Sequence, residues 1–149
     1  MNRYSCIFIA GLMGLGVAMT TRVTAETESD LMYRPASISS GQEISDRLTE
    51  ADIPTGEGGF ARDYAVNLTE GDQVAIDLLS DDFDSLVILL ATDGTTVAEN
   101  DDGPDGSTNS LLFMRITETG RYIVRVRAFG ETGGGEFSLK VTRLQPIAE

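Results

Sequence analysis

The sequence predicts an all-β protein, a single domain folded as a jelly-roll-like antiparallel β-sandwich. From residue 41 onward, short runs with apolar side chains at every second position alternate with turns rich in Gly, Asp and Asn, which is the pattern of half-buried strands in a sandwich. No segment of this region carries a convincing 3.6-residue apolar period, although residues 43–51 could form a short helix.

Residues 1–25 have the features of a signal peptide. Arg3 supplies the positive start, residues 6–19 are almost entirely apolar, and Val23-Thr24-Ala25 provides small residues for cleavage. The apolar stretch is shorter than the roughly 20 residues that span a bilayer. We therefore expect a secreted or periplasmic protein with no stable membrane span after cleavage, the alternative being an uncleaved N-terminal anchor.

The rest of the chain divides into three parts. Residues 26–40 are polar and read as a linker or N-terminal arm, residues 41–144 form the predicted sandwich, and residues 145–149 form a tail. The single cysteine, Cys6, lies in the leader, so the exported domain must rely on its core, on bound ions, or on both.

The strands follow from the alternation of side chains. Inward rows are predicted in residues 60–68, 74–78, 112–116, 122–128 and 137–141. Residues 86–91 are apolar on both faces, as expected of a central strand covered from both sides, and a return strand at 95–98 follows the turn Asp93-Gly94. Leu86, Ile88 and Leu90 form one face of this central strand, and we expect this face to pack against Val124 and Val126.

The composition excludes most catalytic chemistry. There is no histidine, so Ser-His-Asp and Cys-His sites are impossible, and the only lysine, Lys140, is predicted on an outer face. The remaining alternative is a hydrolase that uses two catalytic carboxylates, and the domain is too small to present a substrate cleft between such a pair. We therefore expect no enzyme activity. The net charge of −13, with no Lys or Arg from residue 63 through 114, also disfavours nucleic-acid binding.

Two acidic clusters suggest a hard cation. One is Asp81-Asp82-Phe83-Asp84, and the other is the loop at residues 99–106. Oxygen-rich loops of this kind suit Ca²⁺, and we expect one ion held by Asp101, Asp102 and Asp105, joined by Asp82 or Asp84. The spacing is not that of an EF-hand, and ordinary solvated turns use the same residue types, so both interpretations stay open.

The arginines of the strand at residues 121–127 also allow two interpretations. Arg121, Arg125 and Arg127 share one face, and they either pair with acids on the neighbouring strands or form a stripe that binds an anionic surface.

Several motifs occur in an order that resembles the bacterial pre-peptidase C-terminal (PPC) domain over about residues 40–143. They are Gly41-Gln42, Asp63-Tyr64-Ala65-Val66, Glu70-Gly71-Asp72-Gln73-Val74, Ser80 through Leu86, Asn100-Asp101-Asp102, Gly120-Arg121-Tyr122 and Gly135 through Leu139. The resemblance implies a jelly-roll-like sandwich of the kind usually appended to secreted proteases. It also implies kinship with calcium-stabilised binding modules of bacterial collagenases.

These observations together predict a secreted, non-catalytic accessory or binding module. Its partner is expected to be an extracellular protein or polysaccharide. Because no protease precedes the domain in this sequence, we expect it to act as a free-standing module. The alternative is a structural or chaperone-like partner of a separately encoded secreted protease.

Overall fold

The alternating residues build two sheets that face each other in the structure, a computed structural model that describes residues 33–130 and 133–145. The predicted signal peptide, residues 26–32 of the predicted arm and residues 146–149 of the predicted tail lie outside the described residues. The described strands are β1 (Ala36–Ser37), β2 (Glu43–Leu48), β3 (Ile53–Pro54), β4 (Phe60–Leu68), β5 (Gln73–Leu79), β6 (Ser85–Leu90), β7 (Thr96–Asn100), β8 (Ser110–Arg115), β9 (Gly120–Ala128) and β10 (Gly135–Leu144).

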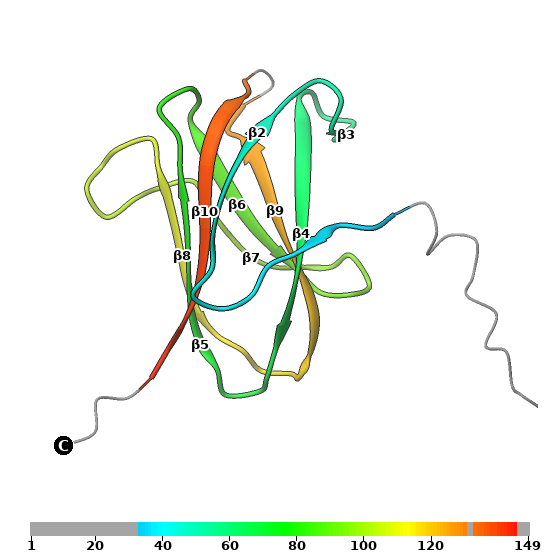
Figure 1. Ribbon diagram of the computed structural model, residues 1–149, viewed down its shortest axis with the longest axis vertical. Helices are drawn as coiled ribbons and strands as arrows, with labels where there is room; N and C mark the ends of the chain where they lie inside the picture. The colour runs from blue at the N-terminus through cyan, green and yellow to red at the C-terminus, as the bar shows by residue number, and fades with distance from the viewer. Residues whose placement is uncertain (1–32, 131–132, 146–149) are drawn as a thin grey trace, which may run out of the picture. The chain divides into compact units, whose positions relative to one another are not determined.

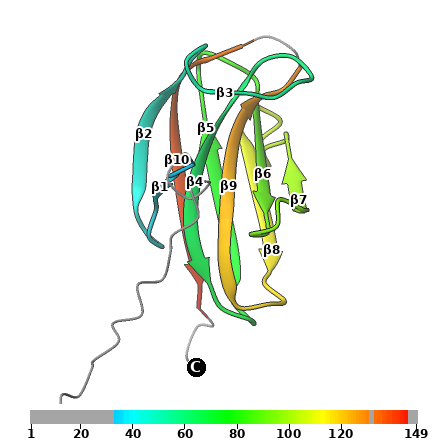
Figure 2. The same ribbon diagram turned by 90° about the vertical axis from the view of Figure 1, so that its right-hand side faces the viewer.

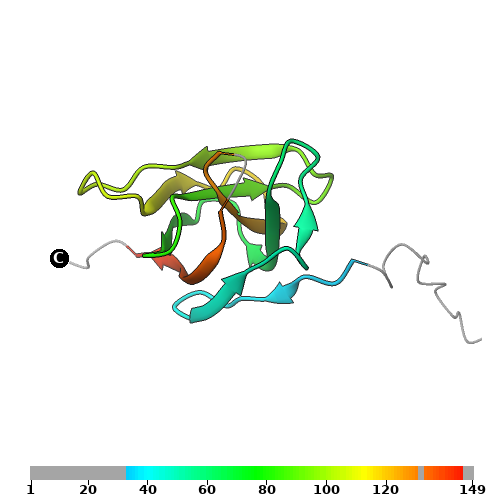
Figure 3. The same cartoon turned by 90° about the horizontal axis from the view of Figure 1, so that it is seen from above.

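One sheet has the order β1-β4-β9-β6-β7, with β3 also paired to β4, and the other has the order β2-β10-β5-β8. Figures 1 and 2 show the two sheets stacked as the layers of a sandwich, and Figure 3 looks along the strands. Every pairing is antiparallel except that of β1 with β4, which is parallel. The predicted all-β sandwich is confirmed. Within the described ranges, no helix is long and apolar enough to cross a membrane.

Part of the predicted N-terminal arm lies in the sandwich. β1 pairs with Tyr64 and Ala65 of β4, the amide of Ile38 donates to Ala65 O at 2.9 Å, and the Ile38 side chain is buried. The chain is therefore attached to the larger sheet before β2 begins.

The core lies between the two sheets and uses the inward rows that the alternation predicts. These rows are Tyr64, Val66 and Leu68 on β4, Val74, Ile76 and Leu78 on β5, Tyr122, Val124, Val126 and Ala128 on β9, and Phe137, Leu139 and Val141 on β10. Phe113 of β8 points outward instead, as its position in the alternation predicts.

The predicted orientation of the central strand β6 is wrong. Val87 and Leu89, both fully buried, lie opposite Val126 and Val124 of β9 in the core. The residues expected there, Leu86, Ile88 and Leu90, lie on the outer face of the sheet in a second cluster with Ala65 and Ile123. Because this strand is apolar on both faces, its sequence does not show which side chains face the second sheet.

The possible helix at residues 43–51 is also wrong, because this segment contains strand β2. Its residues pair with β10 along six positions, and Ile44 and Leu48 face the core. A turn follows the strand, in which the Asp52 carboxylate accepts a hydrogen bond from the Thr49 amide at 2.8 Å. Pairing with β10 and burial of the two apolar residues outweigh the weak local helix tendency.

Candidate functional site on the outer face of the four-stranded sheet

The five predicted calcium ligands lie in two neighbouring loops. Asp82 and Asp84 are in the β5–β6 turn, and Asp101, Asp102 and Asp105 are in the β7–β8 loop. The two loops are in contact, since the Ser80 amide donates to Asn109 Oδ1 at 2.9 Å.

Their contacts are those of turn residues. Asp82 Oδ2 accepts from the Glu136 amide at 2.8 Å, and Asp105 Oδ1 accepts from the amide and hydroxyl of Ser107 at 3.1 and 2.6 Å. The hydrogen bonds from the Ser107 side chain and backbone lower the pKa of Asp105 below its usual value. Asp84 and Asp102 contribute backbone carbonyls, which accept from Phe129 N and Leu111 N.

No three acidic side chains in the described part of the chain form a group that could hold a metal ion. Calcium binding stays a prediction, and the observed contacts favour the solvated-turn alternative.

Arg125 and Arg127 of the arginine row on β9 pair with acids, as one of the two interpretations of this row predicts. Arg125 makes two hydrogen bonds of 2.8 Å to the buried Asp63 of β4, and Arg127 lies 3.7 Å from the exposed Glu57. Tyr33 also donates its hydroxyl to Asp63. Burial, together with the hydrogen bond to and negative charge of Asp63, raises the pKa of Tyr33 to about 12. These residues therefore fasten the start of the described chain to the larger sheet.

A second ion-pair network joins the two sheets at their β2–β4 side. Arg62 of β4 contacts Asp46 of β2 and Asp52 at 2.9 Å each, and its Nη1 donates to Arg47 O at 3.1 Å. Tyr64 donates its hydroxyl to Asp46 at 2.7 Å. Burial alone would raise the pKa of Asp46, but the hydrogen bonds from Tyr64 and the Arg47 amide, with the charge of Arg62, lower it below its usual value.

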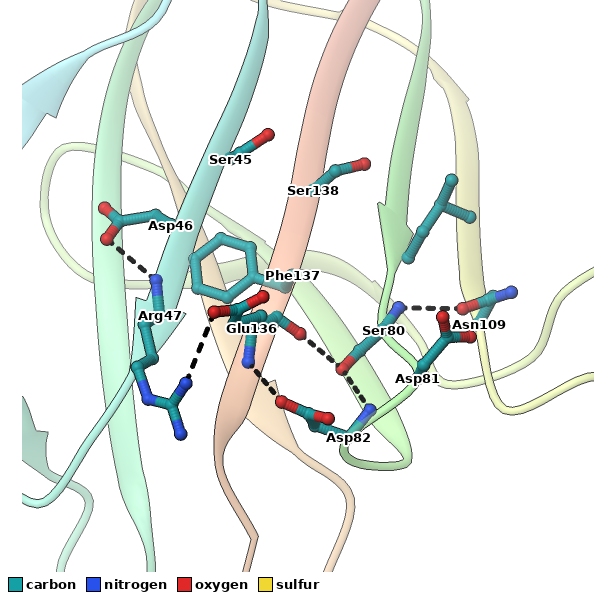
Figure 4. A pocket seen from close by; sticks show the side chains of 11 residues that line it. Ser45, Asp46, Arg47, Ser80, Asp81, Asp82, Asn109, Glu136, Phe137 and Ser138 are labelled. Atoms are coloured by element: carbon teal, nitrogen blue, oxygen red, sulfur yellow. Dashed lines mark hydrogen bonds and ion pairs between the residues drawn. The ribbon is translucent and has the colours of Figure 1, made fainter.

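The outer face of the four-stranded sheet carries a hollow of about 800 Å³ near the β5–β6 turn, shown in Figure 4. Ser138 of β10 forms its floor between Ser45 of β2 and Leu79 of β5. The remaining lining is mostly polar and acidic: Asp46, Arg47, Ser80, Asp81, Asp82, Asn109, Glu136 and Phe137.

The rim of the hollow is held by short contacts between the loop and β10. Ser80 Oγ donates to Glu136 O at 2.7 Å, and the Glu136 amide donates to Asp82. Gly135 has a φ of 142°, and a Cβ there would lie 2.3 Å from the Asp82 Cβ. Glycine at this position therefore lets the Asp82 side chain lie directly against the start of β10 (Figure 4).

An apolar strip follows the hollow on the same face. Leu79 is 47% exposed, and Phe113 of β8 is 59% exposed. Leu111, which is half-buried, lies between their rows opposite Asp77, and Phe113 lies opposite Ala75. The sequence predicted the outward direction of Phe113 but not the hollow, because the lateral order β2-β10-β5-β8 joins segments far apart in the chain.

Comparison with known proteins finds domains that are similar to this chain. Residues 61–128 match the model of a family described as the bacterial pre-peptidase C-terminal domain. The crystal structure of the pre-peptidase C-terminal domain of collagenase from Bacillus anthracis is similar to this chain, with a TM-score of 0.56 and 15% identity over 73% of this chain and 95% of that one. The predicted resemblance to the PPC domain is confirmed.

A second similar structure is PliG of Aeromonas hydrophila, a periplasmic inhibitor of g-type lysozyme, with a TM-score of 0.52 and 12% identity over 73% of this chain and 96% of that one. At these identities the two structures establish the PPC-type fold alone. No curated protein sequence matches the chain.

Proposed function

We propose that this PPC-type module is exported and acts as a non-catalytic accessory protein that binds an extracellular polymer or another exported protein. The observation that carries the proposal is the outer face of the four-stranded sheet, where Phe113 and Leu79 are exposed beside a polar hollow. Large apolar side chains grouped on a surface and bordered by polar residues are typical of binding sites.

Two further features support the proposal. The sequence begins with the features of a signal peptide, and one structural neighbour is described as a periplasmic inhibitor. The buried acid Asp63 is bound to Arg125 and Tyr33, so it is a structural group rather than a poised general base.

The test uses the purified protein immobilised on beads. The beads are incubated with medium from the host culture and, separately, with cell-wall and matrix polysaccharides. Retention of one polymer, or a stoichiometric complex with one exported protein identified by mass spectrometry, supports the proposal. Loss of both kinds of binding refutes it.

The family match also favours a second candidate, a structural or chaperone-like partner of a separately encoded secreted protease, because the family is described by its position beside peptidases. A stable complex with a protease in the same experiment supports this candidate and argues against polymer binding. Retention on polysaccharide without any protease argues against it.

A further inference from the structure

We infer that the outer face of the β2-β10-β5-β8 sheet binds an extended polypeptide segment that carries Lys or Arg at one end and apolar side chains at the other. This inference rests on the proposed function, since it names the partner chemistry of the same face.

The charge of the hollow selects a cation. Asp81, Asp82 and Glu136 are exposed around it, and among the described residues that line it Arg47 alone is basic. Arg47 lies 3.5 Å from Glu136, and both side chains are more than half exposed, so this pair is weak and replaceable. The fourth carboxylate of the lining, Asp46, is already bound by Arg62.

The hollow is therefore left with more negative than positive charge, at the surface of a chain whose net charge is −13. Such a field attracts a cationic partner from solution and repels an acidic polymer. Lysine or arginine side chains gain an attraction here that a neutral polysaccharide does not gain.

The geometry of the face selects an extended segment. The floor residue Ser138 is followed along β10 by Lys140 and then Thr142 on the same outer face, and Thr142 lies opposite Ala75. Residues on one face of a strand recur every ~6.8 Å, so the row of Leu79 and the row of Phe113 are roughly 13 to 14 Å apart. About five extended residues of a partner cover this distance, with alternate side chains directed at the face.

The apolar end has room for a partner side chain. Phe113 lies opposite Ala75, whose small side chain leaves the aromatic ring 59% exposed. Leu111 adds apolar surface beside it. An apolar side chain of the partner that packs against the Phe113 ring removes this surface from water, which is favourable.

The test uses a fluorescein-labelled peptide with Lys at three alternate positions, Leu at the next two alternate positions and Ser between them. A control peptide has Glu in place of each Lys. Fluorescence anisotropy measures the Kd of both for the purified protein. We expect the Lys peptide to bind and the Glu peptide not to bind. Added salt should weaken the binding of the Lys peptide, since salt screens exposed charges.

A matched pair of variants separates the hollow from the general acidity of the chain. Asp81→Asn with Glu136→Gln removes two charges from the hollow, and Asp93→Asn with Glu99→Gln removes two charges from the β6–β7 turn and β7 of the other sheet. We expect the first pair of substitutions to raise the Kd of the Lys peptide by about fivefold or more, and the second pair to raise it by less than about twofold. Equal weakening by both pairs overturns the inference, because binding would then follow the net charge.

A second pair tests the apolar end. Phe113→Ser should weaken the binding of the Lys peptide, whereas Val97→Ser, at an exposed position on β7, should leave this binding unchanged. Equal effects of the two substitutions contradict the role of Phe113. All variants must keep the wild-type Tm within a few degrees, so that a loss of binding reports the surface rather than unfolding.

The outcomes also separate this inference from the proposed function. If the Lys peptide fails to bind while a neutral polysaccharide is retained and the Asp81→Asn, Glu136→Gln variant releases it, the inference is wrong and the proposed function stands. If neither probe binds and no exported protein is captured, both are wrong.

Discussion

The orientation of β6 can be tested by truncating two adjacent leucines that face opposite sides of the sheet. Leu89 is fully buried between the two sheets, opposite Val124 of β9. Leu90 is 8% exposed in the outer cluster with Ala65 and Ile123. Replacing either with Ala removes the same atoms, and only the surroundings differ.

The expected difference comes from the cavity left behind. Losing three buried carbon groups costs about 2.4 kcal/mol in transfer free energy at either position, from about 0.8 kcal/mol per group. At Leu89 the space is enclosed by both sheets and cannot be filled by water, so a cavity cost is added. We expect a loss of about 4 kcal/mol of unfolding free energy for Leu89→Ala and about 2 kcal/mol for Leu90→Ala.

Urea unfolding followed by circular dichroism measures both losses. The dependence of the unfolding free energy on urea should be the same in the two variants, which shows that the denatured states are comparable. If Leu90→Ala costs as much as Leu89→Ala or more, the outer cluster is the true core face of β6. The orientation predicted from the sequence would then be the correct one.

Three further predictions use the charged side chains. Asp63→Ala should cost about 2–4 kcal/mol of unfolding free energy, because it leaves Arg125 without its partner; a cost below about 0.5 kcal/mol in a urea titration would show that the pair is not structural. The pKa of Asp46 is lowered on folding, so its stabilising contribution is present at pH 7 and is lost as the pH falls below about 4. Asp46→Asn should therefore lower the urea midpoint at pH 7 and differ less from wild type at pH 3, and an equal difference at both pH values contradicts this. For the predicted calcium site we expect Ca²⁺ to raise the Tm by several degrees more than Mg²⁺ does at matched ionic strength; equal shifts of the Tm would show that the two loops are solvated turns.

The sequence predicted those parts of the fold in which each strand has one apolar and one polar face. Strands β4, β5, β9 and β10 are of this kind, and their inward rows are found in the core. Strand β6 has no polar face, so the alternation could not identify which side of it faces the second sheet. The segment at residues 43–51, for which a helix was considered, was assigned wrongly for a different reason. Its strand β2 gains its stability from pairing with β10, about ninety residues away in the chain, and local sequence does not show this pairing.

The candidate site was less predictable for a related reason. Acidic clusters are visible in a sequence, and they drew attention to Asp101, Asp102 and Asp105. The side-chain hydrogen bonds of Asp105 are to Ser107 of the same loop. The hollow instead combines residues from β2, the β5–β6 turn, the β7–β8 loop and β10. Its floor residues Ser45 and Ser138 carry no signal of their own, and they become neighbours only through the lateral order of the strands.

The network around Arg62 also bears on how copies of the protein behave at high concentration. β2 is an outer strand of its sheet, and the open backbone groups of such a strand are a template on which another chain can add a strand. At Arg47 both groups are occupied, since the amide donates to Asp46 Oδ1 at 2.8 Å and the carbonyl accepts from Arg62. An incoming chain would have to displace one of these hydrogen bonds before it could form a ladder hydrogen bond at this position. The contacts of Arg47 therefore make this position of the outer strand less available to a neighbouring chain.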